Sequence, residues 1–421
     1  MPERETWSSR AGFVLACIGS AVGIGNLWRF PYVVGTHGGG AFLIPYVIAV
    51  AACGLPLMIL EFALGRRFRS SVVPAFAALR PGLRWLGYGL VLVQTMILAY
   101  YLVVTGWVLA YFLAFAAGAP MTFAAFTDSY VPLLFFLLAG GLCFLVVQSG
   151  VRRGLERLCN VSMPVLIAML GLLAAVALSL PGAGRGVAFY LTPDFTRLAD
   201  PLVWTAAFGQ AFFSLGVGTG IMLTYGSYLA HAGIARSALL ITAADLVVAI
   251  AGGLVVFPVV FSFGYDPEAG VRLAFVTLPR IFEEMGFGLL FGSTFFLLLF
   301  FAALTSAVSI LEVPVATLMD VWGISRRRAA AAATGVVMLL GLPSALSYTA
   351  LRLELFGMPL LDLKDFVFGT VGMTLGAIVM SVAAGWFVRE RLLPRPLMVV
   401  IRVVVPVALA ASLVARLADW R

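Results

Sequence analysis

Residues 7–31 read WSSRAGFVLACIGSAVGIGNLWRFP, and this stretch decides the fold. It is long and apolar enough to cross a bilayer, which takes about 20 mostly apolar residues in a helix. Yet Gly19, Ser20, Gly23, Gly25 and Asn26 crowd its middle. Because each glycine costs a helix about 1 kcal/mol relative to alanine, the cluster favours either close helix packing or a backbone that leaves the helix.

A second cluster of small residues lies in the sixth apolar run, residues 202–230. It contains Ser214, Gly216, Gly218, Thr219 and Gly220. Each cluster lies near the middle of the first run of a possible five-helix half. Interrupted helices in corresponding positions are typical of transporters built from inverted repeats, so the pairing favours two broken helices over packing alone.

The composition requires lipid as the solvent for most of the chain. Of 421 residues, 62% are hydrophobic and 11% are charged, and the mean hydropathy is +1.07. About eleven apolar runs are long enough to span a bilayer. We expect spans at residues 10–34, 40–65, 86–117, 131–148, 158–180, 202–230, 237–264, 289–319, 329–347, 366–388 and 396–417.

These spans form one membrane domain, since no hydrophilic stretch is long enough for a separate soluble domain. No cleavable signal is expected, because the first run begins after Arg10, contains Arg29 and is much longer than a signal h-region. The four cysteines lie in or at the ends of spans, so free thiols are expected. They are Cys17, Cys53, Cys143 and Cys159.

The net charge of +8 comes from cations in short loops, which membrane topology explains better than nucleic-acid binding. With the N-terminus in the cytoplasm, the inside loops carry Arg4, Arg66, Arg67, Arg69, Arg80, Arg84, Arg152, Arg153, Arg157, Arg236, Arg326, Arg327, Arg328, Arg389, Arg391 and Arg395. The outside segments carry Arg185, Arg197, Arg272, Arg280, Arg352, Lys364, Arg416 and Arg421, diluted by acids such as Glu268. We therefore expect a multi-pass protein of the bacterial inner membrane with a cytoplasmic N-terminus and an extracytoplasmic C-terminus.

Four further segments agree with residues 7–31 in pointing to one family. They are GGGAFLIPY at 38–46, GLPLMILEFALGR at 54–66, GQAFFSLGVGTGIMLTYGSY at 209–228 and FFAALTSAVSILE at 300–312. In spacing and order the chain resembles the neurotransmitter:sodium symporter family, in its bacterial amino-acid branch. The resemblance implies an all-α polytopic protein with the leucine-transporter fold, in which helices 1 and 6 are broken. It also implies inverted repeats at residues 1–180 and 181–388 and a peripheral eleventh helix within 389–421.

The function implied is sodium-coupled import of an amino acid by alternating access. Unwound backbone exposes amides and carbonyls that can hold a carboxylate and a hard cation. By resemblance, one sodium site uses the Ala21 carbonyl, the side chains of Asn26, Ser214 and Asp245, and the substrate carboxylate. The second uses the carbonyls of Gly19, Val22 and Ala302 with the hydroxyls of Thr305 and Ser306. The alternative for Thr305 and Ser306 is that each hydroxyl bonds back to its own helix.

Asp245 also bears on chloride. An isolated carboxylate at membrane depth is expensive, and a neighbouring sodium ion offsets the cost. Relatives with Asn at this position often rely on chloride for negative charge, so we expect that chloride is not required. Tyr46, Gln210 and Ser214 match chloride ligands, but Ala249 stands where chloride-dependent members carry serine.

The resemblance also implies a substrate pocket. Its contacts are Ser20, Ala21, Ile24, Gly25, Ile97, Tyr101, Phe213, Ser214, Gly216, Thr219, Ser306 and Ile310. Tyr101 is expected to hydrogen-bond the substrate carboxylate. Gly23 stands where monoamine carriers have an Asp, so an α-amino acid is the expected cargo. The mostly apolar wall favours a neutral, bulky hydrophobic or aromatic one.

Charged residues near the ends of the transport path complete the expected set. Arg29 and Asp365 are expected to form an outer gate, and Arg4 and Asp320 an inner gate beside Trp7 and Tyr228. Glu61 is expected to receive amides freed by the break in helix 6. For Glu312 the expectation is a buried hydrogen bond, and a protonated carboxyl is compatible with it.

Other classes of function fit the sequence less well. An ion channel also uses mid-membrane carbonyls, but paired breaks with a substrate pocket argue against it. An enzyme is disfavoured because only His37 and His231 are present, with no metal-binding or nucleophile motif. A sensor or a transport-inactive relative remains an alternative, and the chain is compatible with a monomer or a dimer.

Overall fold

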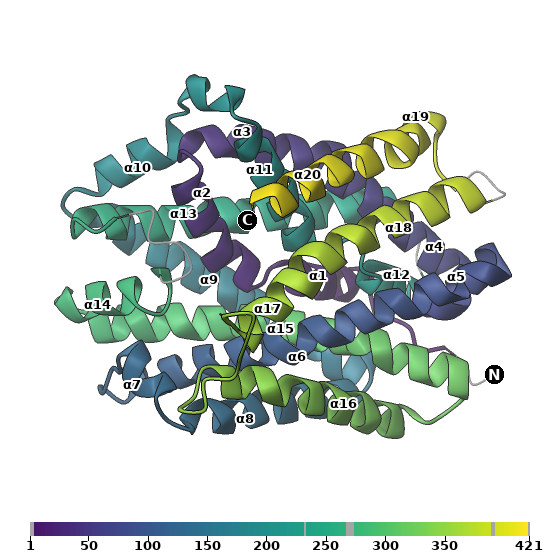
Figure 1. The fold of residues 1–421 in the computed structure, drawn as a ribbon, viewed down its shortest axis with the longest axis horizontal. Coiled ribbons are helices and arrows are strands. Elements are labelled where there is room, and N and C mark those ends of the chain that lie inside the picture. The colour runs from purple at the N-terminus through teal and green to yellow at the C-terminus, as the bar shows by residue number, and fades with distance from the viewer. Residues whose placement is uncertain (1–3, 231–232, 267–272, 389–391, 420–421) are drawn as a thin grey trace.

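The computed structural model describes residues 4–230, 233–266, 273–388 and 392–419. Several residues named above lie outside these ranges. They are His231, Glu268, Arg272, Arg389, Arg391 and Arg421. The long helices run side by side along the longest axis of the molecule, with the described N-terminal residues at one end of the bundle (Figure 1).

Nine helical segments of the described residues are long and apolar enough to cross a membrane. Their elements are α3 (Gly40–Ala49), η2 (Val50–Gly54), α4 (Leu55–Phe68), η3 (Pro81–Leu83), α6 (Arg84–Ala116), α8 (Val131–Gln148), η4 (Val151–Glu156), α9 (Arg157–Ser179), α13 (Ile234–Ser262), α15 (Gly288–Trp322), α16 (Arg326–Ser347), α17 (Leu360–Lys364), η7 (Asp365–Gly372), α18 (Met373–Phe387), α19 (Arg395–Val399), η8 (Val400–Val404) and α20 (Val405–Asp419). Each of the nine segments coincides with an expected span, and its ends differ from the expected ones by a few residues.

The first expected span is broken as predicted. It consists of α1 (Arg10–Ala21), η1 (Gly25–Arg29) and α2 (Phe30–Thr36), and the two parts are bent by 49°. The sixth expected span is likewise divided into α11 (Pro201–Leu215) and α12 (Ile221–Ser227). Between them Gly216, Gly218 and Gly220 have φ values of +60°, +81° and +89°. Glycine adopts this left-handed backbone without the steric cost that other residues pay, so the cluster ends the helix.

The short elements connect the long helices. They are α5 (Val72–Leu79), α7 (Phe123–Thr127), α10 (Ala183–Leu191), η5 (Phe195–Ala199), α14 (Thr277–Glu284) and the antiparallel pair of β1 (Glu354–Leu355) and β2 (Met358–Pro359). Helices α7, α10 and α14 lie at the end of the bundle opposite the N-terminus (Figure 1). The four cysteines are buried and free, as expected.

Close helix packing holds the two broken spans in place. A Cβ atom on Gly65 of α4 would lie 2.0 Å from the Leu223 carbonyl oxygen of α12, so only glycine allows this approach.

At the end of α15, Gly323 takes a left-handed φ of +65°, and α16 begins three residues later. This tight reversal brings the start of α16 back against the last turns of α15.

Candidate functional site

A small cavity of about 50 Å³ lies where the two helix breaks face α6 and α15. Its lining residues are Ser20, Ala21, Gly23, Gly25, Gln94, Ile97, Tyr101, Phe213, Ser214, Gly216, Thr219, Ile221, Ser306, Ile310 and Met373. All expected substrate contacts are among them except Ile24, which lines the adjoining, larger cavity. Of the described residues that line the small cavity, none carries a charge.

The break after α1 exposes backbone at this cavity. Val22 has an extended conformation, and its N–H closes the helix on the Ile18 carbonyl at 2.7 Å. The Gly23 N–H donates to Asn26 Oδ1 at 3.1 Å. A Cβ atom on Gly23 would lie 2.7 Å from Ser306 Oγ and 3.2 Å from Tyr101 Oη. Glycine at position 23 therefore keeps open the space beside the two hydroxyls.

The three side chains expected at the first sodium site, those of Asn26, Ser214 and Asp245, meet in one cluster. Asp245 of α13 is fully buried and accepts from Asn26 Nδ2 at 2.7 Å. Ser214 Oγ lies 3.0 Å from each carboxylate oxygen, and Asn26 Nδ2 also lies 2.9 Å from Ser214 Oγ. Ala21 ends α1 just before the break. The cluster supplies several oxygen atoms and one carboxylate, a donor set suited to a hard cation.

The second expected sodium site gathers around Ser306 of α15. Its hydroxyl lies 3.4, 3.2 and 3.4 Å from the carbonyl oxygens of Gly19, Ser20 and Val22. Thr305 instead donates within its own helix, to Phe301 O at 2.9 Å and Ala302 O at 3.2 Å. The two hydroxyls thus differ in geometry, since Ser306 Oγ faces the carbonyls of the broken span and Thr305 Oγ1 bonds to its own helix.

Glu61 of α4 has the role expected of it. It is fully buried, and its carboxylate accepts from the Gly218 N–H and, at 3.2 Å, from the Leu223 N–H. These amides lack helical partners because the backbone leaves the helix at residues 216–220. Glu61 therefore fixes the break between α11 and α12.

A larger cavity of about 740 Å³ adjoins the small one and shares Gly25, Tyr101 and Phe213 with it. Arg29 and Asp365 both line it, but no ion pair joins them among the described residues. Instead Arg29 Nη1 lies 3.4 Å from Gln210 Oε1, and the guanidinium sits 4.2 Å above the centre of the Phe213 ring.

The expected inner-gate residues are in contact. Arg4 Nη1 donates to both carboxylate oxygens of Asp320 at 2.8 Å. The Arg4 guanidinium also donates to Ser227 and lies 4.9 Å from the centre of the Tyr228 ring. Trp7 donates from Nε1 to the Tyr225 carbonyl at 3.0 Å. These contacts join the N-terminal segment to residues 225–228 and to the last turn of α15.

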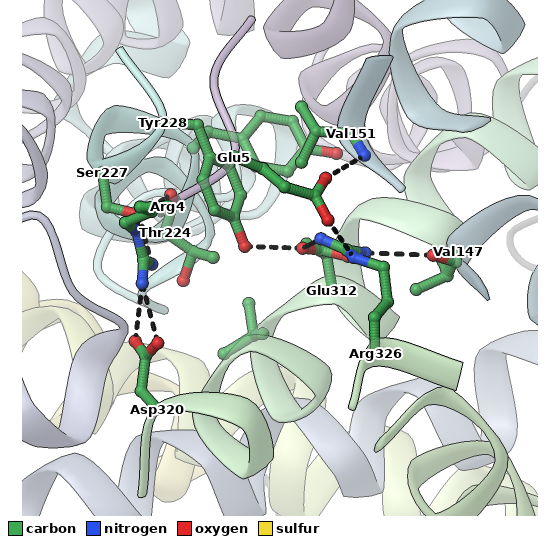
Figure 2. Close-up of polar contacts among 12 residues, drawn as sticks. Arg4, Glu5, Val147, Val151, Thr224, Ser227, Tyr228, Glu312, Asp320 and Arg326 are labelled. Carbon is green, nitrogen blue, oxygen red and sulfur yellow. Dashed lines mark hydrogen bonds and ion pairs between the residues drawn. The ribbon is translucent and has the colours of Figure 1, made fainter. Parts of the chain in front are cut away.

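Glu312 has the buried hydrogen bond expected of it and an ion pair in addition. Figure 2 shows its carboxylate between Arg326 and Tyr228. Arg326 donates to it at 2.7 and 2.9 Å, and Tyr228 Oη donates at 2.6 Å. These contacts to a guanidinium are charge-assisted and stronger than a hydrogen bond between neutral groups. Arg326, expected in a charged loop, has a side chain only 10% exposed.

Two further carboxylates join the N-terminal segment to η4, one from each side. Glu5 belongs to the N-terminal segment and Glu156 to η4. Glu5 Oε2 accepts from the Val151 N–H at 2.7 Å, while its Oε1 accepts from Arg326 Nε at 2.7 Å (Figure 2). Glu156 in turn accepts from the Ser8 N–H at 2.9 Å. Residues 5–8 are therefore tied to the start of the fifth span.

The family model described as "Sodium:neurotransmitter symporter family" matches residues 4–132 and 129–407. The chain belongs to this family. It is 39% identical to an uncharacterized sodium-dependent transporter of Bacillus subtilis, over 89% of this chain and 86% of the relative. It is 29% identical to the sodium- and chloride-dependent GABA transporter 2 of Mus musculus, over 76% of this chain and 62% of the relative.

Among solved structures, this symporter is similar to MhsT, whose crystal structure is in complex with L-phenylalanine. The TM-score is 0.89 at 37% sequence identity, covering 98% of this chain and 99% of MhsT. The symporter therefore has the leucine-transporter fold. It is a sodium-dependent, multi-pass membrane transporter of a small-molecule substrate and not an enzyme.

Sequence reasoning missed three residues of the small cavity. Ile221 and Met373 are apolar residues in apolar segments, so no signal distinguishes them. Gln94 does carry a signal, because it lies three residues before Ile97 and seven before Tyr101. At 3.6 residues per turn these three positions share one face of α6.

Proposed function

We propose that this symporter imports a neutral, bulky hydrophobic or aromatic L-amino acid together with sodium. The observation that carries the proposal is a pair of hydroxyls, Ser20 Oγ and Tyr101 Oη, which are buried without a hydrogen-bond partner among the described residues. Both residues line the small cavity beside the exposed backbone at Gly23. Buried polar groups are normally satisfied, so a substrate carboxylate is a fitting partner for them.

The rest of the cavity supports a neutral side chain. Ile97, Phe213, Ile221, Ile310 and Met373 give it a largely apolar wall. An ionised side chain buried against this wall costs several kcal/mol, because nothing there compensates its lost hydration. The phenylalanine in the MhsT crystal structure is in keeping with this substrate class.

We infer two sodium sites, with sodium as a second cargo. In the first, Asn26, Ser214, Asp245 and the Ala21 carbonyl bind the ion together with the substrate carboxylate, which couples the two cargoes directly. In the second, Ser306, Thr305 and the carbonyls of Gly19, Val22 and Ala302 bind the ion. Asp245 supplies negative charge from the protein, so chloride is not required.

We infer alternating access controlled by gates at the two ends. The ion pair of Arg4 with Asp320, and the separation of Arg29 from Asp365, support the larger cavity as the open side. We infer that this side is extracytoplasmic and that the N-terminus is cytoplasmic, in the inner membrane of a bacterium. The matching breaks after Ala21 and Leu215 support inverted repeats at residues 1–180 and 181–388, with residues 389–421 peripheral.

The test is uptake into proteoliposomes containing the purified protein. Each of the twenty amino acids is offered with an inward sodium gradient, with potassium in place of sodium, and with gluconate in place of chloride. We expect saturable, sodium-dependent uptake of bulky neutral amino acids that persists without chloride. Best uptake of glycine, glutamate or lysine contradicts the proposed substrate class.

A further inference from the structure

Gln94 is the one residue with a side-chain amide among those that line the small cavity in the described part of the chain. It belongs to α6 and is 1% exposed. Its Nε2 lies 3.4 Å from the Thr219 carbonyl oxygen, whereas its Oε1 has no hydrogen-bond partner among the described residues. A strong acceptor is therefore buried and unused at the wall of the cavity.

The neighbouring groups fix which end of the amide is free. A carbonyl oxygen such as that of Thr219 can only accept, so the amide nitrogen must face it. Turning the amide over would place two acceptors together and lose this bond. Thr219 Oγ1 already donates to the Gly216 carbonyl at 2.7 Å, so it is engaged elsewhere. The unused group at Gln94 is therefore an acceptor and needs a donor.

The position of Gln94 relative to Tyr101 suggests where that donor comes from. The two residues are seven positions apart on one face of α6, which is about 10 Å along the helix. Tyr101 lies at the end of the cavity assigned to the substrate carboxylate. Gln94 therefore lies toward the other end of the cavity, whose lining also includes the apolar residues Ile97, Ile221 and Met373.

We propose that Gln94 Oε1 accepts a hydrogen bond from the side chain of the transported amino acid. The cargo then has an apolar side chain with a donor at its far end, as in the indole N–H of tryptophan or the phenol O–H of tyrosine. This inference rests on the proposed function and narrows its substrate class. Phenylalanine and leucine have no side-chain donor and leave Gln94 Oε1 buried without a partner. Because an unpaired buried acceptor is energetically costly, they should bind more weakly than tryptophan or tyrosine.

The experiment compares tryptophan with 3-(3-benzothienyl)alanine, in which sulfur replaces the indole N–H with little change in shape. Sodium-dependent binding of each is measured on the full-length protein in detergent by competition with labelled tryptophan. We expect tryptophan to bind about tenfold more tightly, the effect of one buried hydrogen bond lost with its acceptor left unpaired. Tyrosine should exceed phenylalanine in the same way.

The variant Gln94→Met removes the acceptor and keeps the length of the side chain. It should bring two affinity ratios close to one, that of tryptophan to its sulfur analogue and that of tyrosine to phenylalanine. The change should come from weaker binding of tryptophan and tyrosine, with the affinity for phenylalanine unchanged. Thr95→Val is the matched control, since the Thr95 hydroxyl bonds back to the Val91 carbonyl at 2.8 Å and Thr95 does not line the cavity. It should leave the ratios unchanged.

The outcomes separate the two proposals. Equal wild-type affinity for tryptophan and its sulfur analogue overturns the role of Gln94, and this measurement needs no variant to fold. Sodium-dependent binding of phenylalanine and leucine with no preference for a donor overturns this inference alone. Absence of sodium-dependent binding of any neutral amino acid overturns the proposed function as well.

Discussion

Arg326 and Glu312 form a two-point ion pair, with Nη2 to Oε1 at 2.7 Å and Nη1 to Oε2 at 2.9 Å. The Glu312 side chain is fully buried and that of Arg326 nearly so. Arg326 also binds Glu5 and the Val147 carbonyl, so one guanidinium joins the N-terminal segment, the end of α8 and the reversal from α15 to α16. Figure 2 shows these contacts meeting at one point.

Removing one partner of this pair should destabilise the protein strongly. Arg326→Met leaves the Glu312 carboxylate buried and uncompensated, and we expect the free energy of unfolding to fall by about 3–5 kcal/mol. The combined Arg326→Met and Glu312→Gln variant should lose less than the sum of the two single variants. Thermal unfolding in detergent measures all three.

The control for this cycle is the pair of Arg352 and Asp128, which lie 3.3 Å apart with side chains 74% and 62% exposed. Because water screens exposed charges, Arg352→Met should change stability by no more than about 1 kcal/mol. Equal losses of stability in Arg326→Met and Arg352→Met would show that burial does not strengthen the pair of Arg326 and Glu312. Strict additivity of Arg326→Met and Glu312→Gln would show the same.

Asp245 should decide the response to chloride. Asp245→Ala removes the carboxylate that accepts from Asn26 and Ser214, so coupled uptake should be abolished. Asp245→Asn keeps an oxygen for sodium but drops the charge, so transport should persist and become chloride-sensitive. Uptake in chloride and in gluconate is compared for each variant. An identical chloride response in wild type and Asp245→Asn contradicts the assigned role.

The second sodium site should depend more on Ser306 than on Thr305. Ser306 faces the carbonyls of the broken span, whereas Thr305 bonds to its own helix. Ser306→Ala should therefore raise the sodium concentration needed for half-maximal binding by about tenfold, and Thr305→Val should raise it less. Thr294→Val on the same helix is the control, because Thr294 donates to Leu290 O at 2.8 Å and lies away from the cavity. An unchanged sodium dependence in Ser306→Ala would falsify the assignment.

Arg29 and Asp365 should act together although they are apart in this structure. Closing the larger cavity requires Arg29 to leave Gln210 and the Phe213 ring, at little energetic expense since the polar contact is 3.4 Å long. Arg29→Ala and Asp365→Ala should each impair uptake, and exchanging the two charges should restore part of it. Wild-type rates in both single variants would remove the case for an outer gate.

Much of this fold is predictable because lipid imposes a simple rule on sequence. Each span has to be apolar for about 20 residues, and irregular backbone at membrane depth has to face protein or a cavity. The glycines at 216, 218 and 220 signal such a break, and the buried carboxylate of Glu61 confirms its placement by accepting the freed amides. The family resemblance names Asn26, Ser214 and Asp245 together, and the structure brings these three side chains into contact.

The contacts of Arg326 and Gln94 illustrate what the sequence alone does not provide. Arg326 reads as one of several loop cations, and only the tight reversal at Gly323 brings it against Glu312. Gln94 has no role assigned from the sequence. Its unused oxygen becomes apparent only when the Thr219 carbonyl is seen to occupy the amide nitrogen. Both depend on packing geometry between helices and not on local pattern.

The size of the cargo should depend on Gly216 and Thr219. A Cβ atom on Gly216 would have only Ile221 Cδ1 nearby, at 3.9 Å, so space for a larger residue exists at this side of the cavity. Gly216→Ser and Thr219→Phe should both fill that space and shift preference toward smaller apolar amino acids. The expected change in relative binding free energy is about 1–3 kcal/mol, the range set by a methylene-scale misfit. Competition of labelled leucine or tryptophan uptake by each unlabelled amino acid measures the ranking.

Backbone strain has to be separated from volume in this test. Gly216 has a φ of +60°, and a serine in this left-handed conformation costs about 1 kcal/mol. Gly264→Ser is the matched control, since Gly264 has a φ of +72°, open space around it and a position outside both cavities. It should lower stability by a similar amount without altering the ranking of substrates. An unchanged ranking in both Gly216→Ser and Thr219→Phe, or a shift of equal size in Gly264→Ser, means that residues 216 and 219 do not line the part of the pocket that holds the side chain.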